Sequence, residues 1–323
     1  MIKYPLWKRQ EIRSKWRNIL SIFIVIVLVF AIINGLTKSI SLKKYFGEGR
    51  WDGESSFVAT FSTSPPSLFI YQSDPKRVVF LTVDPNLFFV TGKQDKPIMK
   101  IGEIKDKYGG EELLRIMSLN FRAKIDNFVI FKNNQTISET NVEKLFGDFK
   151  SFVSPMLYFT KRELLDTNIS RIDMTRLWWQ LKGVGVNQMQ LVDMSNFHEE
   201  IVLAKGVQVL GVDSVSLNRK IKDYLENPSL AEFEVEIQNG SGSGEAGDLA
   251  VDFMASMGFS VKDIFGSNQV GETVIFAKKN FATSLLAKIF NCDIKALPKE
   301  ARGDDSGKII IAIGQDFANK YFE

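Results

Sequence analysis

The first part of the chain contains one long apolar run. From Ile19 to Ile33 every residue except Ser21 is apolar. Extended to Trp16–Leu36, the run would form a helix about 31 Å long, close to the thickness of about 30 Å of a bilayer's hydrocarbon core. The pattern therefore predicts a transmembrane helix, which we place at residues 18–36.

Two other interpretations of this run fit the pattern less well. A cleaved signal peptide has an apolar centre of about 7–15 residues that ends at a small-residue cleavage site. The exit Asn34–Lys38 shows no such site. A buried helix of a soluble domain is disfavoured because no polar face interrupts the run. An uncleaved membrane anchor is the favoured interpretation.

The charges on either side predict the orientation of this helix. Residues 1–17 carry six lysines and arginines against Glu11, a net charge of 6 − 1 = +5, and cytoplasmic flanks collect basic residues. We expect residues 1–17 to be a cytoplasmic tail, 37–55 a polar linker, and the remainder to lie outside the cytoplasm. The predicted localisation is the cell membrane, with a single pass.

Beyond the linker, short apolar strands alternate with amphipathic helices, as in an α/β domain. We predict strands at residues 67–72, 77–83, 126–132, 184–192 and 205–209, and helices at 111–120, 169–181 and 213–226. Leu87–Val90 is expected to continue the second of these strands. The buried face of the last helix is predicted to consist of Val215, Leu217, Ile221 and Leu225. Asn227-Pro228-Ser229 ends this domain, placed at 56–229, because a proline stops the preceding helix.

Residues 232–323 are predicted to form a second, smaller domain. Strands are expected at 232–238, 260–265, 272–277, 293–296 and 308–313, with helices at 245–257 and 281–289. This βαββαβ order with one additional strand is that of a small split-βαβ domain. The predicted fold class is therefore α/β, with two domains behind a single N-terminal transmembrane helix.

Composition excludes several classes of function. The whole chain has a formal charge of +3, so the part after residue 17 sums to 3 − 5 = −2, which argues against a nucleic acid partner. Cys292 and His198 are the only cysteine and histidine. Intrachain disulfides, cysteine-based metal sites and paired histidine ligands are therefore excluded. We expect no metal and no other cofactor.

Three motifs between residues 100 and 129 resemble a known family. They are Lys100-Ile101-Gly102-Glu103, the run KYGGEELL at 107–114 and the run IDNFV at 125–129. With a preceding Asp74-Pro75 turn between two strands, they are similar to the K-I-N-x-A, Y-G-G-x-x-L-L and I-D-x-Y-V motifs of the LytR-CpsA-Psr family. The resemblance implies an extracytoplasmic α/β/α domain that transfers polyprenyl-pyrophosphate-linked glycopolymers to peptidoglycan. It also implies magnesium held among arginines and aspartates.

The charged positions of that family are mostly absent here. Where the family has P-R-D-T, the chain has Asp84-Pro85-Asn86-Leu87, and where it has R-S-D-T, the chain has Ser64-Pro65-Pro66-Ser67. Its arginine-rich segment has no counterpart between residues 149 and 165, and Arg171 and Arg176 lie on the next predicted helix, where we expect solvated charges. A pyrophosphate needs arginines and a metal needs carboxylates. The sequence thus predicts a degenerate domain without catalytic, cofactor-binding or metal-binding residues.

Two further groups of residues have both an ordinary and a functional explanation. Asp84, Glu103 and Asp106 could ligate a metal, but scattered carboxylates are usually surface charges. Trp178 and Trp179 could form a surface for a lipid or a sugar ring. Large aromatic residues on an amphipathic helix usually pack in the core, and we favour that interpretation.

A glycine pattern follows the strand at 232–238. Gly242, Gly244 and Gly247 spell G-x-G-x-x-G, and Asp263 lies 21 residues after Gly242, as in a dinucleotide-binding fingerprint. The strand pattern is not that of a doubly wound fold, and the remaining chain is too short for one. We favour the interpretation that the glycines allow a tight turn and close packing of helix on strand.

The end of the chain carries a second resemblance. The run VEIQNGSGSGEAGDLA at 235–250, Met257-Gly258-Phe259 and the run IAIGQDF at 311–317 are similar to the LytR C-terminal domain, over about 90 residues. Members of that family have a strand ending in N-G-x-G, a helix ending in L-G-F and a last strand followed by G-x-D-F. The resemblance implies no catalytic residues.

These observations favour a membrane-anchored, non-catalytic envelope protein that binds glycopolymer, a polyprenyl lipid or a partner in wall assembly. One alternative is a divergent but active transferase of the LytR-CpsA-Psr type. Another is a structural scaffold without a glycan ligand. The expected partners are the membrane, through the anchor, and polyprenyl-linked glycopolymer or peptidoglycan. The sequence leaves enzymatic activity open, and the missing charged positions argue against it.

Overall fold

The structure is a computed structural model, and it describes residues 49, 51–53, 55–93, 95, 97–132, 135–154, 165–202, 206–297 and 308–322. The predicted cytoplasmic tail and transmembrane helix, and most of the linker, lie outside the described residues. No helix within the described ranges is long and apolar enough to span a bilayer. Apart from Gly49 and Ser170–Ile172, the described residues belong to one compact unit. The division into domains 56–229 and 232–323 stays a prediction.

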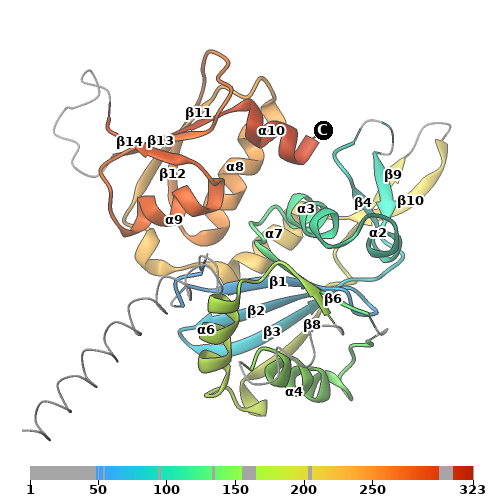
Figure 1. Cartoon of the computed structure of the whole chain (residues 1–323). Coiled ribbons are helices and arrows are strands. Elements are labelled where there is room, and N and C mark those ends of the chain that lie inside the picture. Colours follow the sequence, from blue (N-terminus) through green and yellow to red (C-terminus); the bar gives the residue numbers. More distant parts are fainter. Residues whose placement is uncertain are drawn as a thin grey trace, which may run out of the picture. The chain divides into compact units, whose positions relative to one another are not determined.

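A six-stranded mixed sheet forms the centre of the first part of the chain (Figure 1). Strand β1 is parallel to β6, and β3 is parallel to β8, while the other neighbours are antiparallel. In spatial order the strands are β7 (Leu165–Thr167), β6 (Asn127–Phe131), β1 (Phe57–Phe61), β2 (Ser67–Ser73), β3 (Lys76–Thr82) and β8 (Met189–Asp193). The predicted turn at Asp74-Pro75 between two strands is confirmed, because β2 and β3 form an antiparallel hairpin, paired from Ser67–Thr82 to Ser73–Lys76.

Helices cover both faces of this sheet, so the central strands are buried throughout. One face packs on α3 (Gly110–Phe121) and α7 (Ser214–Leu225), and the other on α4 (Val142–Phe152) and α6 (Arg171–Leu181). Strands buried on both faces read as continuous apolar runs rather than alternating ones. This explains the sequences SLFIYQS of β2 and KRVVFLT of β3.

Aromatic rings fill the layer between the sheet and α4. The rings of Phe61 and Phe69 stack with centroids 5.2 Å apart, and Phe149 of α4 meets them at 4.8 Å and 5.0 Å. Phe80 packs edge-on against Phe69 at 5.4 Å. All four side chains are fully buried. Truncating one of these rings would cost about 3–5 kcal/mol.

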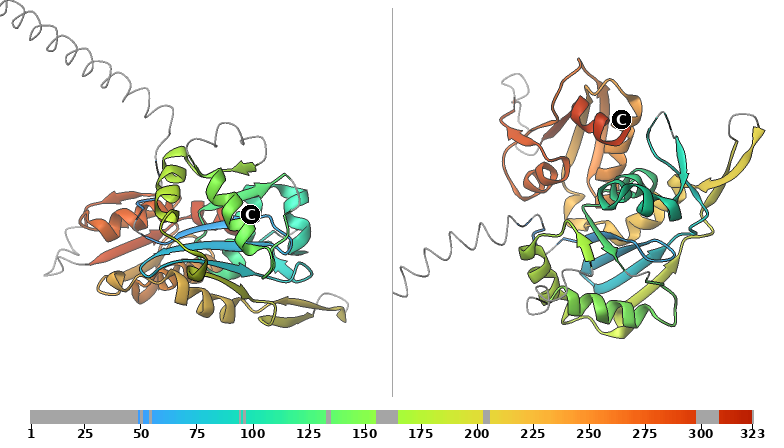
Figure 2. Two further views of the ribbon diagram at one scale, coloured as in Figure 1. Left: turned by 90° about the horizontal axis from the view of Figure 1, so that it is seen from below. Right: turned by 45° about the vertical axis from the view of Figure 1, so that its right-hand side comes forward.

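A second sheet of four strands corrects one prediction. In spatial order it contains β5 (Ile98–Lys100), β4 (Phe88–Val90), β10 (Gln208–Val212) and β9 (His198–Val202). Leu87–Val90 therefore does not continue β3. The chain turns after β3, since Leu87 N–H donates to Asp84 O at 3.1 Å, and β4 then pairs with β5 and β10. The β9–β10 hairpin projects from the molecule in both views of Figure 2.

The bounds of two predicted strands and the predicted buried face of one helix differ from those in the structure. The strand at 205–209 lies at 208–212, and the strand at 184–192 begins with the short 3-10 helix η2 (Val186–Gln188) before β8. On α7, Leu217, Ile221 and Leu225 are buried as predicted, but Val215 is 64% exposed. The three leucine and isoleucine positions repeat every four residues, and Val215 lies two residues before them, on the other side of the helix.

The C-terminal part has its own sheet and its own apolar core. The strands lie in the order β12 (Ser260–Gly266), β11 (Glu234–Asn239), β15 (Ile309–Ile313), β13 (Val274–Phe276) and β14 (Asp293–Lys295). Helices α8 (Gly244–Met257) and α9 (Phe281–Phe290) connect parallel neighbours, β11 to β12 and β13 to β14. The predicted βαββαβ order is confirmed, but the units are not split, because no strand lies between the two that each helix joins.

Helix α10 (Gln315–Phe322), which was not predicted, follows β15 and packs against α3 and α8. Its Tyr321 and Phe317 rings lie 5.0 Å apart in the C-terminal core, with Phe253 of α8 at 5.5 Å from Tyr321. The short sequence QDFANKYF has too few turns for a clear helical period. Its burial depends on partners that are distant in sequence.

Candidate functional site

The glycines of the Y-G-G motif have a structural role. Gly109 has φ +80°, a left-handed conformation that favours glycine, and it separates α2 (Ile101–Tyr108) from α3. A Cβ on Gly110 would lie 2.3 Å from the ring of Phe128 on β6. The two glycines therefore allow α3 to approach the central sheet.

The end of the sheet where β1 and β2 meet is where the family resemblance would place charged residues. Thr63 Oγ1 donates to Pro65 O at 2.7 Å and lies 2.8 Å from Ser67 Oγ. Ser64 pairs with the chain after β6, through its N–H to Gln135 O at 2.8 Å and its carbonyl to Ile137 N at 3.1 Å. Neutral side chains and backbone groups thus satisfy one another at this end of the sheet.

The carboxylates near the same end are engaged in local turns. Asp84 Oδ1 accepts hydrogen bonds from Asn86 N at 2.8 Å and Asn86 Nδ2 at 3.0 Å. Asp193, at the end of β8, accepts from Ser195 N at 2.9 Å and from Ser195 Oγ at 2.6 Å. Residues 62–67 and 83–87 contain one carboxylate and no lysine or arginine. This part of the site could not neutralise a pyrophosphate by itself.

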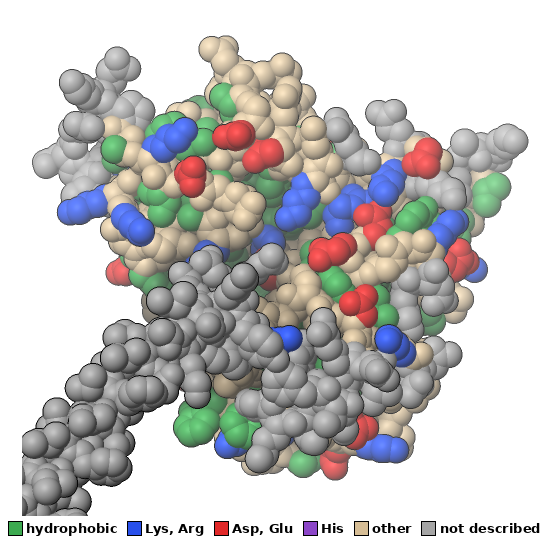
Figure 3. Space-filling view, in the orientation of Figure 1, with side chains coloured by type: hydrophobic (Ala, Val, Ile, Leu, Met, Phe, Trp, Pro, Cys, Tyr) green, Lys and Arg blue, Asp and Glu red, His purple; other side chains and the backbone are tan. Residues whose placement is uncertain are grey.

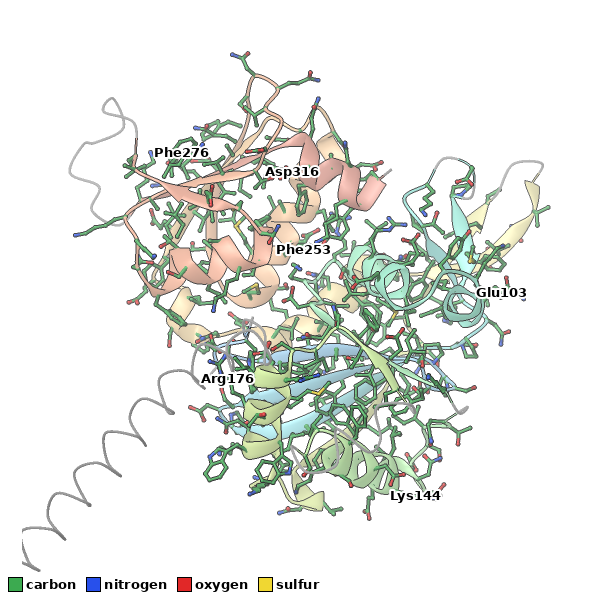
Figure 4. The ribbon with its side chains drawn as sticks, viewed as in Figure 1. Glu103, Lys144, Arg176, Phe253, Phe276 and Asp316 are labelled. Carbon is green, nitrogen blue, oxygen red and sulfur yellow. The ribbon has the colours of Figure 1, made fainter. Side chains whose placement is uncertain are left out.

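The structure describes the side chains of two of the three candidate metal ligands, Asp84 and Glu103. Glu103 lies exposed on α2 (Figure 4), and this helix starts next to the Asp84 turn, because Gly102 N–H donates to Pro85 O at 3.1 Å. Asp106 lies on α2, but its side chain is outside the described part of the structure. Within the described residues, no group of three or more histidine, cysteine, aspartate or glutamate side chains could hold a metal ion.

Arg176, which was expected to be a solvated charge, forms hydrogen bonds with other parts of the protein. Its Nη1 donates to the carbonyl oxygen of Trp51 and lies 3.5 Å from Asp173 Oδ1. Asp173 is buried and also accepts from Trp51 N at 3.2 Å. The two residues of α6 therefore hold the segment before β1 in place. Arg171 is the first residue of the same helix.

The G-x-G-x-x-G turn is filled by the protein's own side chains. Asn239 Oδ1 accepts from Ser241 N at 3.2 Å, and Asn239 Nδ2 donates to Ser243 O at 2.8 Å. A Cβ on Gly247 would lie 2.6 Å from Asn239 Nδ2. Ser243 caps α8, because its Oγ accepts from Ala246 N. The glycines serve the turn and the helix–strand contact, while Asp263 lies mid-strand in β12.

The two tryptophans of α6 differ in burial. Trp178 is partly buried against the core, but Trp179 is 68% exposed, so the predicted core position is wrong for Trp179. Lys182 Nζ lies 3.5 Å from the ring centroid of Trp178 and 4.9 Å from that of Trp179. An ammonium group over an aromatic face is attracted by the ring quadrupole. The pair forms an exposed aromatic surface next to a cation, a usable contact for a ligand.

A cavity of about 420 Å³ lies at the other end of β1, and residues from both halves of the chain line it. Its walls combine apolar side chains with lysines and aspartates. They include Trp51, Asp52, Phe57, Lys124, Asp126, Asn127, Leu225, Leu230, Met257, Leu285, Lys288, Ile289 and Lys320. Sequence reasoning missed this site because its residues come from six separate segments, and no local motif marks them.

Polar contacts beside the cavity join α3 to the C-terminal part. Arg115 binds Glu112 through two hydrogen bonds of 2.9 Å and 2.8 Å. It also donates to the carbonyl oxygens of Thr91 and Tyr321, each at 2.6 Å. Gly92 is required here, because a Cβ would lie 2.1 Å from Tyr321 O. Figure 3 shows lysine and arginine side chains interspersed with carboxylates over α3 and β4.

Two carboxylates at these contacts have pKa values shifted in opposite directions. The hydrogen bond from Arg115 is the main cause that lowers the pKa of Glu112, and Lys93 adds to it. Burial raises the pKa of Asp252 on α8, although Arg122 pairs with it. We conclude that the charged form of Glu112 stabilises the fold, while the charge of Asp252 is only partly compensated.

Residues 232–317 match the protein family described as LytR cell envelope-related transcriptional attenuator. The match confirms the resemblance of the C-terminal part to the LytR C-terminal domain, and it defines the class of that part of the chain. A comparison with curated proteins finds no match.

Among solved structures, the Lin1025 protein of Listeria innocua is similar, with 12% identity over 53% of this chain and 99% of its own, and a TM-score of 0.41. Bacillus subtilis TagU is 7% identical over 54% of this chain and 98% of its own, with a TM-score of 0.38. TagT bound to LIIa-WTA is 11% identical over 54% and 92%, with a TM-score of 0.37. These likenesses are too distant to carry an inference about a site or an activity.

Proposed function

We propose that the chain is a cell-envelope protein that binds an envelope component without transferring it. The observation that carries this proposal is the end of the central sheet between β1 and β2, which is closed by neutral groups bonded to one another, Thr63 with Ser67 and Ser64 with Gln135. The family match of residues 232–317 supports the envelope setting.

The chemistry of transfer explains why this closed end matters. Displacing a glycopolymer from a pyrophosphate develops negative charge on the leaving group, which needs arginines or a metal for stabilisation. Residues 62–67 and 83–87 at this end of the sheet offer Asp84 as their one charged side chain, and its Oδ1 accepts hydrogen bonds from Asn86. Binding without transfer requires no such charges.

The apolar run at residues 19–33 supports a membrane anchor in this proposal. With the basic residues 1–17 on the cytoplasmic side, the two domains would be extracytoplasmic, within reach of lipid-linked material. The orientation is tested by placing an epitope after residue 55 and adding protease to the outside of intact cells whose wall has been removed. Digestion by external protease is expected, and protection of that epitope would refute the orientation.

The proposed ligand class is glycopolymer or peptidoglycan, and Trp179 is the best-placed contact. Its exposed ring beside Lys182 can stack on the apolar face of a sugar while the ammonium meets an anionic substituent. Trp179→Ala should weaken the binding free energy of the purified full chain for peptidoglycan by about 0.5–1.5 kcal/mol, the range of an aromatic contact. The exposed Val186→Ala is the matched control. Unchanged binding of Trp179→Ala would exclude this surface.

A transfer assay separates the proposal from its enzymatic alternative. The full chain is incubated with magnesium, a polyprenyl-pyrophosphate-linked glycopolymer and peptidoglycan, and the labelled product is counted. No product above a protein-free control is expected. Product that disappears in Asp84→Asn would establish a divergent transferase instead. If the chain neither transfers nor binds glycopolymer, polyprenyl lipid or peptidoglycan, the scaffold alternative remains.

A further inference from the structure

We propose that the cavity of about 420 Å³ between β1, α7 and α9 binds an anionic amphiphile, a compact phosphate-like head on an aliphatic chain. Phe57 and Asn127, at the starts of β1 and β6, line it. It therefore lies at the opposite end of these strands from the closed site described above. The inference holds whether or not the chain transfers glycopolymers.

The walls of the cavity suit an aliphatic chain. Leu225, Leu230 and Ile289 are buried, and Met257 and Leu285 are partly exposed toward the same space. The volume falls within the range of about 300–1,000 Å³ found for small-ligand sites. Burying one methylene is worth about 0.8 kcal/mol, so each added methylene should tighten binding about fourfold while the chain still fits.

The uncharged polar groups of the lining are largely committed to the protein. Trp51 Nε1 donates to Ser55 O at 2.9 Å, and Asn127 Nδ2 donates to Val58 O at 3.0 Å. Asn227 Oδ1 accepts from Ser229 N at 3.0 Å. A sugar or peptide needs many directional hydrogen bonds, and these side chains have few to offer. This favours a ligand that is recognised by apolar area and charge.

The charges of the lining favour an anion. The cavity has three lysines and two aspartates, a net charge of 3 − 2 = +1. Asp126 pairs with Lys124 at 2.5 Å, and Asp52 Oδ1 accepts from Ser55 N and Oγ at 2.9 Å and 2.8 Å. Lys288 is exposed in the last turn of α9 and forms no ion pair with any described residue. Lysine binds phosphate as a compact point charge, without the bidentate geometry of arginine.

Calorimetry with a short amphiphile tests the proposal. The full chain in nanodiscs of zwitterionic lipid is titrated with n-octyl phosphate below its micelle concentration, with n-octanol and with inorganic phosphate. Three variants are compared: the double charge reversal Lys288→Glu with Lys320→Glu, the cavity-filling Leu285→Trp, and Lys279→Glu. Lys279 is exposed and outside the lining, so it controls for net charge.

We expect one octyl phosphate per chain, with equal affinity for the unmodified chain and Lys279→Glu. The double charge reversal should weaken binding at least about tenfold, and Leu285→Trp should abolish it. Decyl phosphate should bind about fifteenfold tighter than octyl phosphate, from two methylenes at about 0.8 kcal/mol each.

Three results would overturn the proposal. If octanol binds as tightly as octyl phosphate, the cavity does not recognise the phosphate. If inorganic phosphate binds as tightly as octyl phosphate, the site binds the anion and does not recognise the aliphatic chain. Octyl phosphate binding undiminished to a folded Leu285→Trp variant would place the ligand elsewhere, including in the nanodisc lipid. If Leu285→Trp does not fold, the affinities of the double charge reversal and of Lys279→Glu for octyl phosphate are compared. Equal affinities of these two variants would overturn the proposal.

Discussion

Replacing Arg115 by methionine should loosen the contact between α3 and the C-terminal part. Met keeps the side-chain stem but removes the guanidinium, whose four hydrogen bonds of 2.6–2.9 Å reach Glu112, Thr91 O and Tyr321 O. Only 10% of the Arg115 side chain is exposed, so solvent screens these bonds little. Each side chain left without its partner carries a desolvation cost.

The expected loss of stability on Arg115→Met depends on the ion pair that Glu112 keeps after the substitution. Breaking a buried charge pair costs about 3–5 kcal/mol. Glu112 keeps its ion pair with Lys93 at 2.9 Å and is itself 17% exposed, which places the expected loss near the lower end, about 3 kcal/mol. For a compact unit of this size, that corresponds to a decrease in Tm of about 6–12 °C. Thermal unfolding of the full chain at pH 7, followed by circular dichroism, measures it.

The pH dependence gives a second, independent check. The pKa of Glu112 is lowered mainly by Arg115, so its charged form stabilises the fold above the ordinary value of 4.5. That contribution is lost as the pH falls through the lower pKa of the folded state. The difference between the unmodified chain and Arg115→Met should therefore shrink below pH 4.5. A loss at pH 7 no larger than that of the exposed control Arg219→Met would refute the reasoning, and so would a difference that is the same at pH 7 and pH 3.5.

Three further substitutions or reactions test other parts of the structure. Gly110→Ala should lower the free energy of unfolding by about 1–3 kcal/mol, because its Cβ would meet Phe128 at 2.3 Å. Adding Phe128→Leu to the same chain should recover part of that loss, because the leucine side chain is smaller. No recovery would contradict the contact. Asp252→Asn should leave stability at pH 7 unchanged or slightly higher, since burial raises the pKa of Asp252 despite Arg122; a loss as large as that of Glu112→Gln would contradict this. Burial raises the pKa of Cys292 to about 12, so iodoacetamide at pH 8 should react far more slowly with the native chain than with the chain in urea, and equal rates would contradict it.

The elements that sequence patterns identify are those whose signals are local. The β2–β3 hairpin has a turn at Asp74-Pro75 between two apolar runs, and α8 has a serine cap, an apolar face and Gly258 with φ +102° after its last residue. Helix α10 and the strands β1 and β9 were not predicted, since eight and five residues carry too little periodicity. Such short elements are stabilised by partners elsewhere in the chain. Helix α4 was not predicted either, although it has eleven residues.

The burial of two individual side chains was predicted wrongly because it also depends on parts of the chain that are distant in sequence. Val215 and Trp179 have residue types that usually pack in cores, but their exposure depends on which face of each helix meets the sheet. The closed end at Thr63 and Ser67 could be anticipated, because missing charges are visible in the sequence itself. The cavity could not, because Lys124 and Lys288 are brought together only by the packing of separate segments.

The position of β15 has a consequence for how the C-terminal part is assembled. Among the described strands it comes last in sequence, but it lies at the centre of its sheet, between β11 and β13. Before it is synthesised, the two βαβ units share no hydrogen-bonded strand, and each exposes an unpaired edge. The sheet can therefore close only after β15 has been synthesised, through contacts with a large separation in sequence, which slows folding. A chain truncated before Ile309 would lose the whole module rather than one strand, and its open edges would be sites for aggregation.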